Sequence, residues 1–331
     1  RLRYDILIIP YSLPFVKIFE NYIDNIKLKF KKRLEIFSTL CYHLYNCVRG
    51  LIMLEIIANA KVNLFLEITG KLSNGYHTVD TVMQSVSLAD VLKIGLLPNE
   101  SGINITCSDP EIPTDERNIA YKVARDYLDV SDAKCGVSID ITKNIPSQAG
   151  MGGGSADGAA VLVGLNHLCG NLLSVDCLKD IAAKNGADIP FCIDGGTQRL
   201  SGIGTDLVES YLSPKIPLVI VKPRSGISTP AAYRYLDSIH NDFLDHMTMN
   251  PGDLLEALRS TNFASIGSSL YNRFEEVLEQ LCVDSLQIIT WLKAHGCCAL
   301  LSGSGTAVFG IANDLIEAQR IADSISNQFP D

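Results

Sequence analysis

The stretch Pro146-Ser-Gln-Ala-Gly-Met-Gly-Gly-Gly-Ser-Ala-Asp157 is the most informative part of this chain. It follows an alternating segment at 135–143 and precedes an apolar segment at about 155–170, so it joins a predicted strand to a predicted helix. Its four glycines, at 150 and 152–154, let the backbone bend and approach a ligand without a Cβ in the way. The free N–H groups and the positive dipole end of the helix would face this loop, which predicts a phosphate-binding site.

If no other motif accompanied the loop, a flexible glycine hinge would explain the same sequence. The loop is not a Walker A motif, because no Gly-Lys-Ser/Thr follows it. It is not a dinucleotide fingerprint either, because the glycine spacing differs and no βαβ unit surrounds it.

Composition excludes several classes of protein. The 331 residues are 47% hydrophobic and 20% charged, as in ordinary globular proteins, and the net charge is −9. An acidic chain is a poor ligand for a nucleic-acid backbone, so no nucleic-acid partner is expected. No apolar run is long enough for a transmembrane helix, so no membrane partner is expected. A small anionic ligand stays possible, since a few local donors suffice to hold it.

The cysteines predict neither a disulfide framework nor a zinc site. None forms a CxxC pair or a Cys/His cluster, and most lie in apolar runs, where cysteine acts as a small hydrophobe. A reducing compartment is the simpler interpretation. The 10 residues are Cys41, Cys47, Cys107, Cys135, Cys169, Cys177, Cys192, Cys282, Cys297 and Cys298.

Residues 1–53 differ from the rest. Up to Ile52 they contain nine Lys/Arg against four Asp/Glu, and Met53 precedes the first strong strand pattern. A partly helical extension, a targeting presequence and an upstream translation are three interpretations. A transit peptide would be poor in acidic residues. We favour an extension that is not part of the catalytic core.

From Leu54 onward, strands and helices come in separate runs, which predicts an α+β fold rather than a doubly wound parallel sheet. Strands are expected at 54–71, 78–97, 135–143, 217–222, 297–301 and 306–312. Helices are expected at 117–129, 155–170, 230–238, 252–260, 264–281 and 284–295, with a last one from about 314, and another that begins after the N-cap Ser174 and stops at Gly186.

Two further motifs accompany the glycine loop. Ala58-Asn-Ala-Lys-Val-Asn-Leu64 lies near the start and Leu301-Ser-Gly-Ser-Gly-Thr-Ala307 near the end. Together with 146–157, and in this order, they resemble the three signature motifs of the GHMP kinases, the superfamily of galactokinase, homoserine kinase and mevalonate kinase. Three ordered motifs are much more specific than any one of them.

Other segments resemble one branch of that superfamily, the diphosphocytidyl-methylerythritol kinases of non-mevalonate isoprenoid biosynthesis. They are Gly70-Lys-Leu-Ser-Asn-Gly-Tyr-His77, Gly186-Ala-Asp-Ile-Pro-Phe191 and Ser228-Thr-Pro-Ala-Ala-Tyr233. The resemblance covers about residues 54–325. It implies an N-terminal domain at 54–208 with the ribosomal protein S5 domain 2-like fold and a ferredoxin-like domain at 209–331, with ATP and substrate between them.

The resemblance implies that Lys61 and Asp188 are catalytic. Asp188 would accept the proton of the substrate hydroxyl, and Lys61 would pair with it and orient that hydroxyl. The residues alone leave other interpretations open, because Lys61 could lie on a strand surface and Asp188 could cap a turn. A buried lysine among apolar residues is costly unless it is paired.

The resemblance also implies two binding regions. Asn118 could instead be an ordinary N-terminal helix residue, Lys143 an exposed strand-end lysine, and each aromatic residue ordinary packing. Expected at ATP are Pro146, Gly150, Met151, Gly152, Gly153, Gly154, Ser155, Ala156, Asn118 and Lys143; expected at the cytidyl substrate are Asn63, Tyr76, His77, Thr229, Pro230 and Tyr233.

Mg²⁺ is the expected metal, held mainly by phosphates and water, with Ser155 as a possible ligand. The expected protein is a monomer or weak homodimer that acts on a small molecule in the bacterial cytoplasm, or in a plastid-type organelle if residues 1–53 are a targeting segment. Two alternatives stay open. One is another GHMP kinase, acting on homoserine or a mevalonate derivative; the other is a catalytically inactive nucleotide-binding protein.

Overall fold

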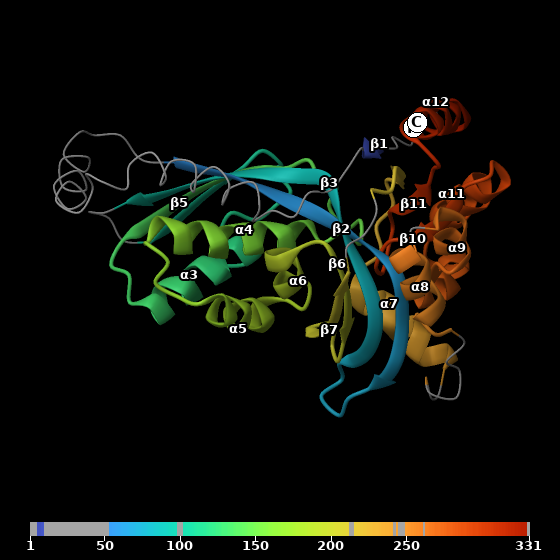
Figure 1. The fold of residues 1–331 in the computed structure, drawn as a ribbon. Helices are drawn as coiled ribbons and strands as arrows, with labels where there is room; N and C mark the ends of the chain where they lie inside the picture. Colours follow the sequence, from blue (N-terminus) through green and yellow to red (C-terminus); the bar gives the residue numbers. More distant parts are fainter. Residues whose placement is uncertain are drawn as a thin grey trace.

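The computed structural model describes residues 5–9, 53–97, 102–211, 215–240, 243, 249–260 and 262–329. They form two sheets with helices packed against them, which confirms the predicted α+β class (Figure 1). The larger sheet has the order β4-β5-β3-β2-β9, and β3 also pairs with β6, which pairs with β7. The smaller sheet has the order β1-β8-β11-β10.

A long hairpin forms the centre of the larger sheet. Its strands are β2 (Met53–Lys71) and β3 (His77–Leu97), and their antiparallel register runs from Met53 opposite Gly95 to Lys71 opposite His77. The turn contains the predicted Ser-Asn-Gly sequence, with Gly75 at a φ of 88°. The other strands of this sheet are β4 (Ile103–Cys107), β5 (Gly136–Thr142), β6 (Thr197–Ser201), β7 (Asp206–Tyr211) and β9 (Tyr271–Asn272).

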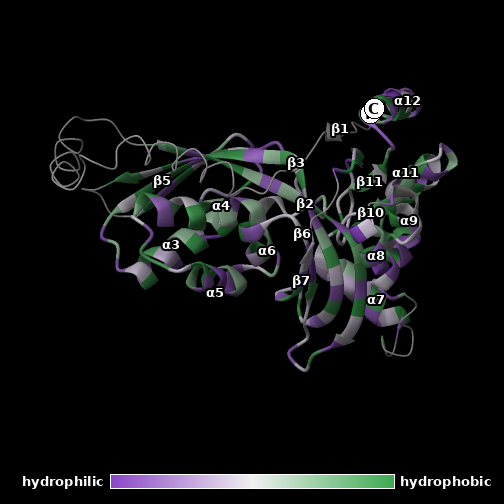
Figure 2. Ribbon diagram, viewed as in Figure 1, coloured by the Kyte–Doolittle hydropathy of each residue, from purple (hydrophilic) through white to green (hydrophobic). Residues whose placement is uncertain are grey.

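Helices cover one face of this sheet, and α4 packs directly against it (Figure 1). Hydrophobic residues recur along α4 and the strands beside it (Figure 2). Gly164 permits this close approach, because a Cβ there would lie 2.6 Å from Ile56 Cδ1. The helices are α3 (Ile119–Ser131), α4 (Gly153–Leu168), α5 (Val175–Asn185) and α6 (Ile189–Asp194), and Ser174 caps α5 as predicted, accepting from the Cys177 N–H.

The smaller sheet is antiparallel throughout and carries helices of the second half. Its strands are β1 (Asp5–Ile9), β8 (Leu218–Lys222), β10 (Cys298–Leu301) and β11 (Val308–Ile311). The helices of this half are α7 (Thr229–Ile239), α8 (Gly252–Ser260), α9 (Phe263–Ser268), α10 (Leu278–Leu281), α11 (Val283–Ala294) and α12 (Leu315–Gln328). No helix among the described residues is both long enough and apolar enough to cross a bilayer.

Part of the extension predicted at residues 1–53 forms the strand β1, Asp5–Ile9. This segment pairs antiparallel with β8, with Asp5 opposite Lys222 and Ile9 opposite Leu218. An edge strand presents unpaired N–H and C=O groups that another extended segment can satisfy, and here that segment comes from the start of the chain. Met53 also belongs to β2. Residues 1–4 and 10–52 lie outside the described part of the chain.

The predicted helix over 264–281 is wrong. The chain leaves α9 at Ser268, adds β9 in parallel to β2, and then forms a 3-10 helix (Arg273–Val277) before α10. Local sequence could not reveal this break, because the partner of β9 lies about 200 residues earlier in the chain.

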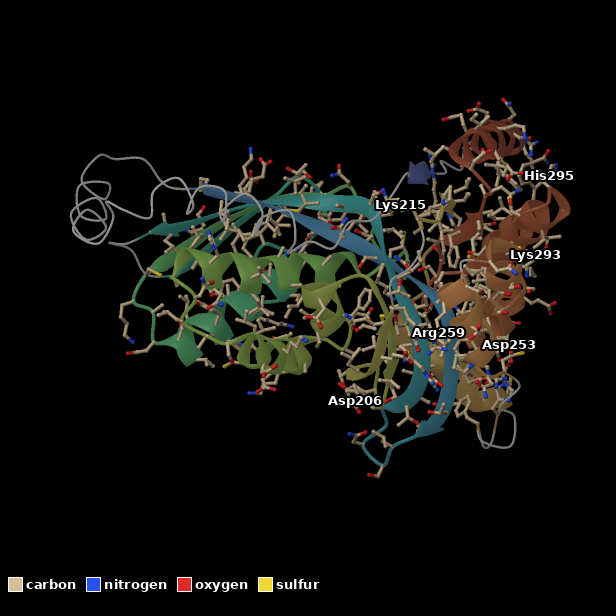
Figure 3. The ribbon with its side chains drawn as sticks, in the orientation of Figure 1. Asp206, Lys215, Asp253, Arg259, Lys293 and His295 are labelled. Atoms are coloured by element: carbon tan, nitrogen blue, oxygen red, sulfur yellow. The ribbon has the colours of Figure 1, made fainter. Side chains whose placement is uncertain are left out.

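Two hydrophobic cores meet along the β2–β3 hairpin. The part of the hairpin away from its turn packs with α3 and α4. Leu66, Ile68 and Val79, which lie nearer the turn, belong instead to the core of the second half of the chain. On the outside, Arg259 of α8, which is labelled in Figure 3, pairs with Glu209 of β7 at 3.0 Å. The two halves are thus joined by a shared hairpin as well as by surface contacts, and a cleft lies between them.

Candidate active site

The cleft has a volume of about 1140 Å³ and is lined by residues from both halves. Of the predicted site residues, Ala156 alone is absent from its lining; it is buried beneath the loop. The structure therefore brings together these residues: Lys61, Asn63, Tyr76, His77, Asn118, Lys143, Pro146, Gly150, Met151, Gly152, Gly153, Gly154, Ser155, Asp188, Thr229, Pro230 and Tyr233.

Lys61 and Asp188 form an ion pair in this cleft. Lys61 Nζ lies 3.2 Å from Asp188 Oδ2, and the Lys61 side chain is 5% exposed whereas that of Asp188 is 28% exposed. Asp188 sits at the N-terminus of α6, but its side chain makes no capping hydrogen bond. Its carboxylate is therefore free to face a ligand, with a buried ammonium beside it to stabilise its charge.

A chain of hydrogen bonds orients Lys61. Its ammonium donates to Asn63 Oδ1 at 2.7 Å, Asn63 Nδ2 donates to Thr81 Oγ1 at 2.9 Å, and the Thr81 hydroxyl donates to the Phe65 carbonyl at 2.7 Å. Asn63 and Thr81 are fully buried. The central hairpin thus sets the position of the lysine before any ligand binds.

The glycine loop packs against the turn of the third motif. Ala307 N donates to the Ala149 carbonyl at 3.1 Å, and Ser302 Oγ donates to the Gly150 carbonyl at 3.1 Å. Gly150 has a φ of 72°, and a Cβ there would lie 2.0 Å from the Ser302 carbonyl oxygen. These two glycine-rich segments, about 150 residues apart in sequence, therefore form one surface.

That surface also contacts the ion pair. A Cβ on Gly152 would lie 3.1 Å from Lys61 Cγ and 3.8 Å from Asp188 Oδ2, and Lys61 N donates to the Met151 carbonyl at 3.0 Å. A Cβ on Gly303 would lie 3.3 Å from Lys61 Nζ. The loop, the lysine and the aspartate are thus in immediate contact.

Helix α4 begins inside the loop. Its N-cap is Gly152, and no side chain caps the first turn. The first N–H groups of the helix are consequently available to an anion, and the helix dipole favours a negative charge there. Ser155 stands in this first turn and lines the cleft. Such an end is suited to a phosphate group.

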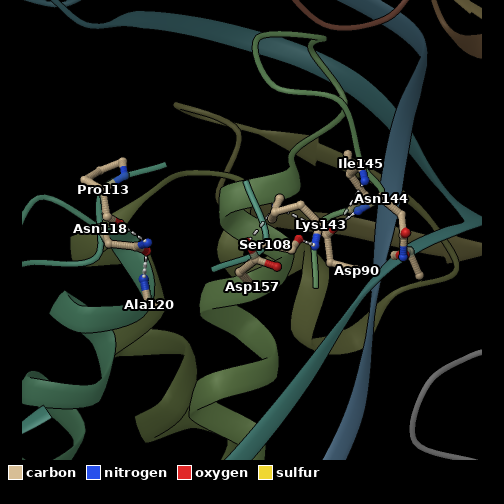
Figure 4. A network of polar contacts seen from close by, with 10 residues as sticks. Asp90, Ser108, Pro113, Asn118, Ala120, Lys143, Asn144, Ile145 and Asp157 are labelled. Atoms are coloured by element: carbon tan, nitrogen blue, oxygen red, sulfur yellow. Dashed lines mark hydrogen bonds and ion pairs between the residues drawn. The ribbon is translucent and has the colours of Figure 1, made fainter. Parts of the chain in front are cut away.

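Lys143 lies in a buried cluster of charges below the loop (Figure 4). Its ammonium binds Asp157 Oδ2 at 2.7 Å and also Asp90. Burial acts to lower the pKa of Lys143, but Asp157 and Asp90 outweigh it and raise that pKa. Burial raises the pKa of Asp157 to about 7, although Lys143 opposes this shift. Asp90 Oδ1 accepts from the backbone N–H groups of Asn144 and Ile145, so the cluster fixes the point where β5 enters the loop.

Asn118 is the N-cap of α3 (Figure 4). Its Oδ1 accepts from the Ala120 N–H at 2.9 Å and its Nδ2 donates to the Pro113 carbonyl at 2.7 Å. Both ends of the amide are engaged with the backbone. The structure thus gives Asn118 the helix-terminal role that the sequence left open, and a contact with the nucleotide stays a prediction.

The other end of the cleft is aromatic. His77 is buried and stacks on Tyr233, with ring centroids 4.4 Å apart and planes 16° apart. Tyr76 is 63% exposed. Thr229, at the start of α7, has its hydroxyl 2.7 Å from Ser304 Oγ in the turn of the third motif. Polar and aromatic groups are therefore both present here, as a pyrimidine nucleotide requires.

Comparisons with known proteins agree with this geometry. Residues 118–196 match the family described as GHMP kinases N terminal domain, and residues 254–331 match GHMP kinases C terminal. A 4-diphosphocytidyl-2-C-methyl-D-erythritol kinase of Desulfitobacterium hafniense (strain Y51) is 41% identical over 275 residues, which is 81% of this chain and 90% of the relative. One from Synechococcus sp. (strain JA-2-3B'a(2-13)) is 41% identical over 284 residues, 83% of this chain and 90% of the relative.

The chain belongs to the 4-diphosphocytidyl-2-C-methyl-D-erythritol kinase family. The crystal structure of a 4-(cytidine 5'-diphospho)-2C-methyl-D-erythritol kinase matches this structure with a TM-score of 0.66 at 30% identity, over 83% of this chain and 96% of the other. A homoserine kinase from Cytophaga hutchinsonii also has a TM-score of 0.66, over 84% of this chain and 90% of the other, but at 20% identity it supports the fold alone. The kinase assignment and the predicted GHMP kinase fold are thus confirmed.

Several residues that shape the site of this family member were not predicted. Asn272 donates both amide hydrogens to the turn of the third motif, at 2.8 Å to the Leu301 carbonyl and 2.8 Å to the Gly303 carbonyl. Asp90, Asp157 and Asp237 were missed as well. One signal was available for Asp90 and Asp157, because each is an acidic residue within an apolar segment, where an unpaired charge would be costly.

A magnesium ion fits this site without a dedicated cage. Among the described residues, no group of three or more His, Cys, Asp and Glu side chains could hold a metal. The helix end and Ser155 are suited to phosphate oxygens, and Mg²⁺ in kinases is commonly bound through such oxygens and water. The metal is thus expected to enter with the nucleotide.

Proposed function

We propose that this protein transfers the γ-phosphoryl group of ATP to the 2-hydroxyl of 4-diphosphocytidyl-2-C-methyl-D-erythritol, the step that its relatives' name describes. One observation carries the proposal. The Lys61–Asp188 pair, 3.2 Å apart, lies against the glycine loop that opens α4. A triphosphate bound at that helix end would present its terminal phosphorus to the pair.

In this proposal Asp188 accepts the proton of the attacking hydroxyl. Lys61 stays protonated, holds Asp188 in place and orients the hydroxyl. Because phosphoryl transfer has a loose transition state, positioning and charge neutralisation contribute more than proton removal. Mg²⁺ would neutralise charge on the phosphates, with Ser155 as the protein group nearest to it in this scheme.

The nucleotide lies along the loop and the first turn of α4. Backbone N–H groups of this loop hold the phosphates, and the charge cluster of Lys143 keeps the entry of the loop in place. The proposed contacts with the nucleotide are Pro146, Gly150, Met151, Gly152, Gly153, Gly154, Ser155, Ala156 and Lys143, with Asn118 near the adenine.

The cytidyl substrate occupies the aromatic end. Tyr76, His77 and Tyr233 face the pyrimidine, whose ring suits stacking and whose edge suits hydrogen bonds. Asn63, Thr229 and Pro230 line the same cleft, and Asn63 and Thr229 would hydrogen-bond the diphosphate or ribose. The sharing of one cleft by both regions supports this arrangement.

We further propose that the protein acts as a monomer or weak homodimer, without nucleic-acid or membrane partners. The bacterial sources of the relatives support a bacterial cytoplasmic site of action. A plastid-type organelle is the alternative if residues 1–53 are a targeting segment.

A coupled ADP-release assay tests the function. We expect turnover with the cytidyl substrate and none with homoserine or mevalonate. Turnover of either simple alcohol in place of the cytidyl substrate would favour another GHMP kinase. Calorimetric ATP binding without any turnover would favour an inactive nucleotide-binding protein.

A further inference from the structure

Asp237 is a carboxylate in the cleft that phosphoryl transfer does not require. It lies on α7, and each of its oxygens has a partner from the β2–β3 hairpin. Oδ1 is 2.7 Å from His77 Nε2, and Oδ2 is 2.6 Å from Lys71 Nζ. All three residues line the aromatic end of the cleft. Burial acts to raise the pKa of Asp237, but the hydrogen bonds from Lys71 and His77 outweigh it and lower that pKa.

The His77 ring is held on several sides. Its side chain is 5% exposed, one face stacks on Tyr233, and the Phe243 ring meets it edge-on with centroids 5.6 Å apart and planes 87° apart. These contacts fix the plane of the imidazole. The contact with Asp237 fixes which edge of the ring faces α7.

The same contact decides where the ring carries its proton. An ionised carboxylate can only accept hydrogen bonds, so His77 Nε2 must be the donor. Lys71 Nζ, 2.6 Å from Asp237 Oδ2, supplies a positive charge beside that carboxylate. In the neutral ring, Nδ1 is then an acceptor. Within the described part of the chain, no residue bonds to this nitrogen, so it is available to a ligand.

We propose that Asp237 is a positioning residue that makes the cleft prefer cytosine to uracil. By holding the proton on Nε2 it presents Nδ1 as an acceptor, which suits the exocyclic amino group of cytosine. Uracil has a carbonyl oxygen at that position, and two acceptors would then face each other. A base paired in the plane of the imidazole would also lie parallel to the Tyr233 ring, which favours stacking.

This inference rests on the proposed function, because it assumes that the substrate carries cytidine. Asp237, on α7, need not touch the substrate itself. Asp237 acts through the tautomer of His77, and the quantity it controls is the ratio of affinities for two bases rather than the affinity for either one.

The test compares Asp237→Asn with the wild-type protein. An amide has nearly the same shape as a carboxylate, but it can turn its NH₂ group toward Nε2 and release the proton to Nδ1. Binding of CDP and UDP is measured by calorimetry. We expect the wild-type protein to bind CDP more tightly, and the Kd ratio of UDP to CDP to fall by about tenfold in the variant, since one hydrogen bond of this kind discriminates bases by about that factor. The KM for ATP should not change.

Asp126→Asn is the matched control. Asp126 is also ion-paired, with Arg125 at 2.8 Å, and its side chain is 26% exposed against 25% for Asp237, but it does not line the cleft. In the Asp126→Asn variant, the Kd ratio of UDP to CDP should equal that of the wild-type protein. Asp237→Glu, which restores a carboxylate, should recover part of the preference. Should Asp237→Asn not fold, Asp237→Ser removes the carboxylate with a smaller side chain and serves as the second variant.

The inference and the proposed function can fail separately. Absence of turnover on the cytidyl substrate by the wild-type protein would contradict the function. A wild-type protein without preference for CDP, or an Asp237→Asn variant that weakens CDP and UDP binding by the same factor, would overturn the role of Asp237 while leaving the function intact.

Discussion

Replacing Gly150 by alanine tests the contact between the glycine loop and the turn of the third motif. The new Cβ would lie 2.0 Å from the Ser302 carbonyl oxygen and 3.0 Å from Gly305 N, both backbone atoms that cannot rotate away. The two segments would have to separate by about 1 Å, and a misplacement of that size costs roughly 10²-fold in turnover. This corresponds to about 2.7 kcal/mol of transition-state stabilisation.

Gly170→Ala is the control for backbone strain. Gly170 has a similar φ of 81°, but a Cβ there meets nothing within 4 Å. Both variants share the cost of a left-handed alanine, about 1–2 kcal/mol of stability. Only Gly150→Ala should lose turnover in the ADP-release assay, after melting curves show that both proteins are folded. Turnover of Gly150→Ala within threefold of Gly170→Ala would refute the idea that close approach of the two segments sets the geometry of the site.

Three further predictions use the same assay or unfolding measurements. Asp188→Asn should lower turnover by roughly 10²- to 10⁴-fold, while calorimetry shows ATP affinity within threefold of wild type; near-normal turnover would defeat its role as the base. Because burial raises the pKa of Asp157 to about 7, the folded protein keeps a proton that the unfolded chain releases near pH 4. The contribution of Asp157 to the free energy of unfolding should therefore fall as pH rises from about 4 to about 7, so in urea titrations the wild-type protein should lose stability relative to Asp157→Asn over this range; parallel pH profiles would contradict the shift. A chain starting at Met53 loses β1, so it should keep its turnover but melt about 5 °C lower, as β8 becomes an exposed edge; an unchanged melting temperature would show that β1 contributes no stability.

Local sequence carried enough information for most of the elements. The alternating pattern at 135–143 predicted β5, the apolar run at 217–222 predicted β8, the Ser174 side chain marked the start of α5, and Gly186 marked its end. In each case the signal lies within a few residues of the feature it predicts, because periodicity and capping are local effects.

The candidate site was predictable for a different reason. Glycines are needed wherever backbone must approach backbone or phosphate, so Gly150 and its neighbours stand out from the residue pattern alone. Lys61 was conspicuous because a lysine in a buried strand requires a partner. The three-motif resemblance then supplied the roles, including that of Asp188.

The sequence by itself determined the fold class, the family and the predicted site residues, such as Lys61 and Asp188, but not Asp157 and Asp237, which also line the cleft. Only the tertiary structure decided which side chains those residues meet. It placed the Gly150 loop on the turn of the third motif, gave Lys143 two carboxylates, and set Asp237 against His77. Such contacts join positions between 14 and 160 residues apart. They depend on strand register and helix packing, which are settled by the burial of whole faces rather than by any local pattern.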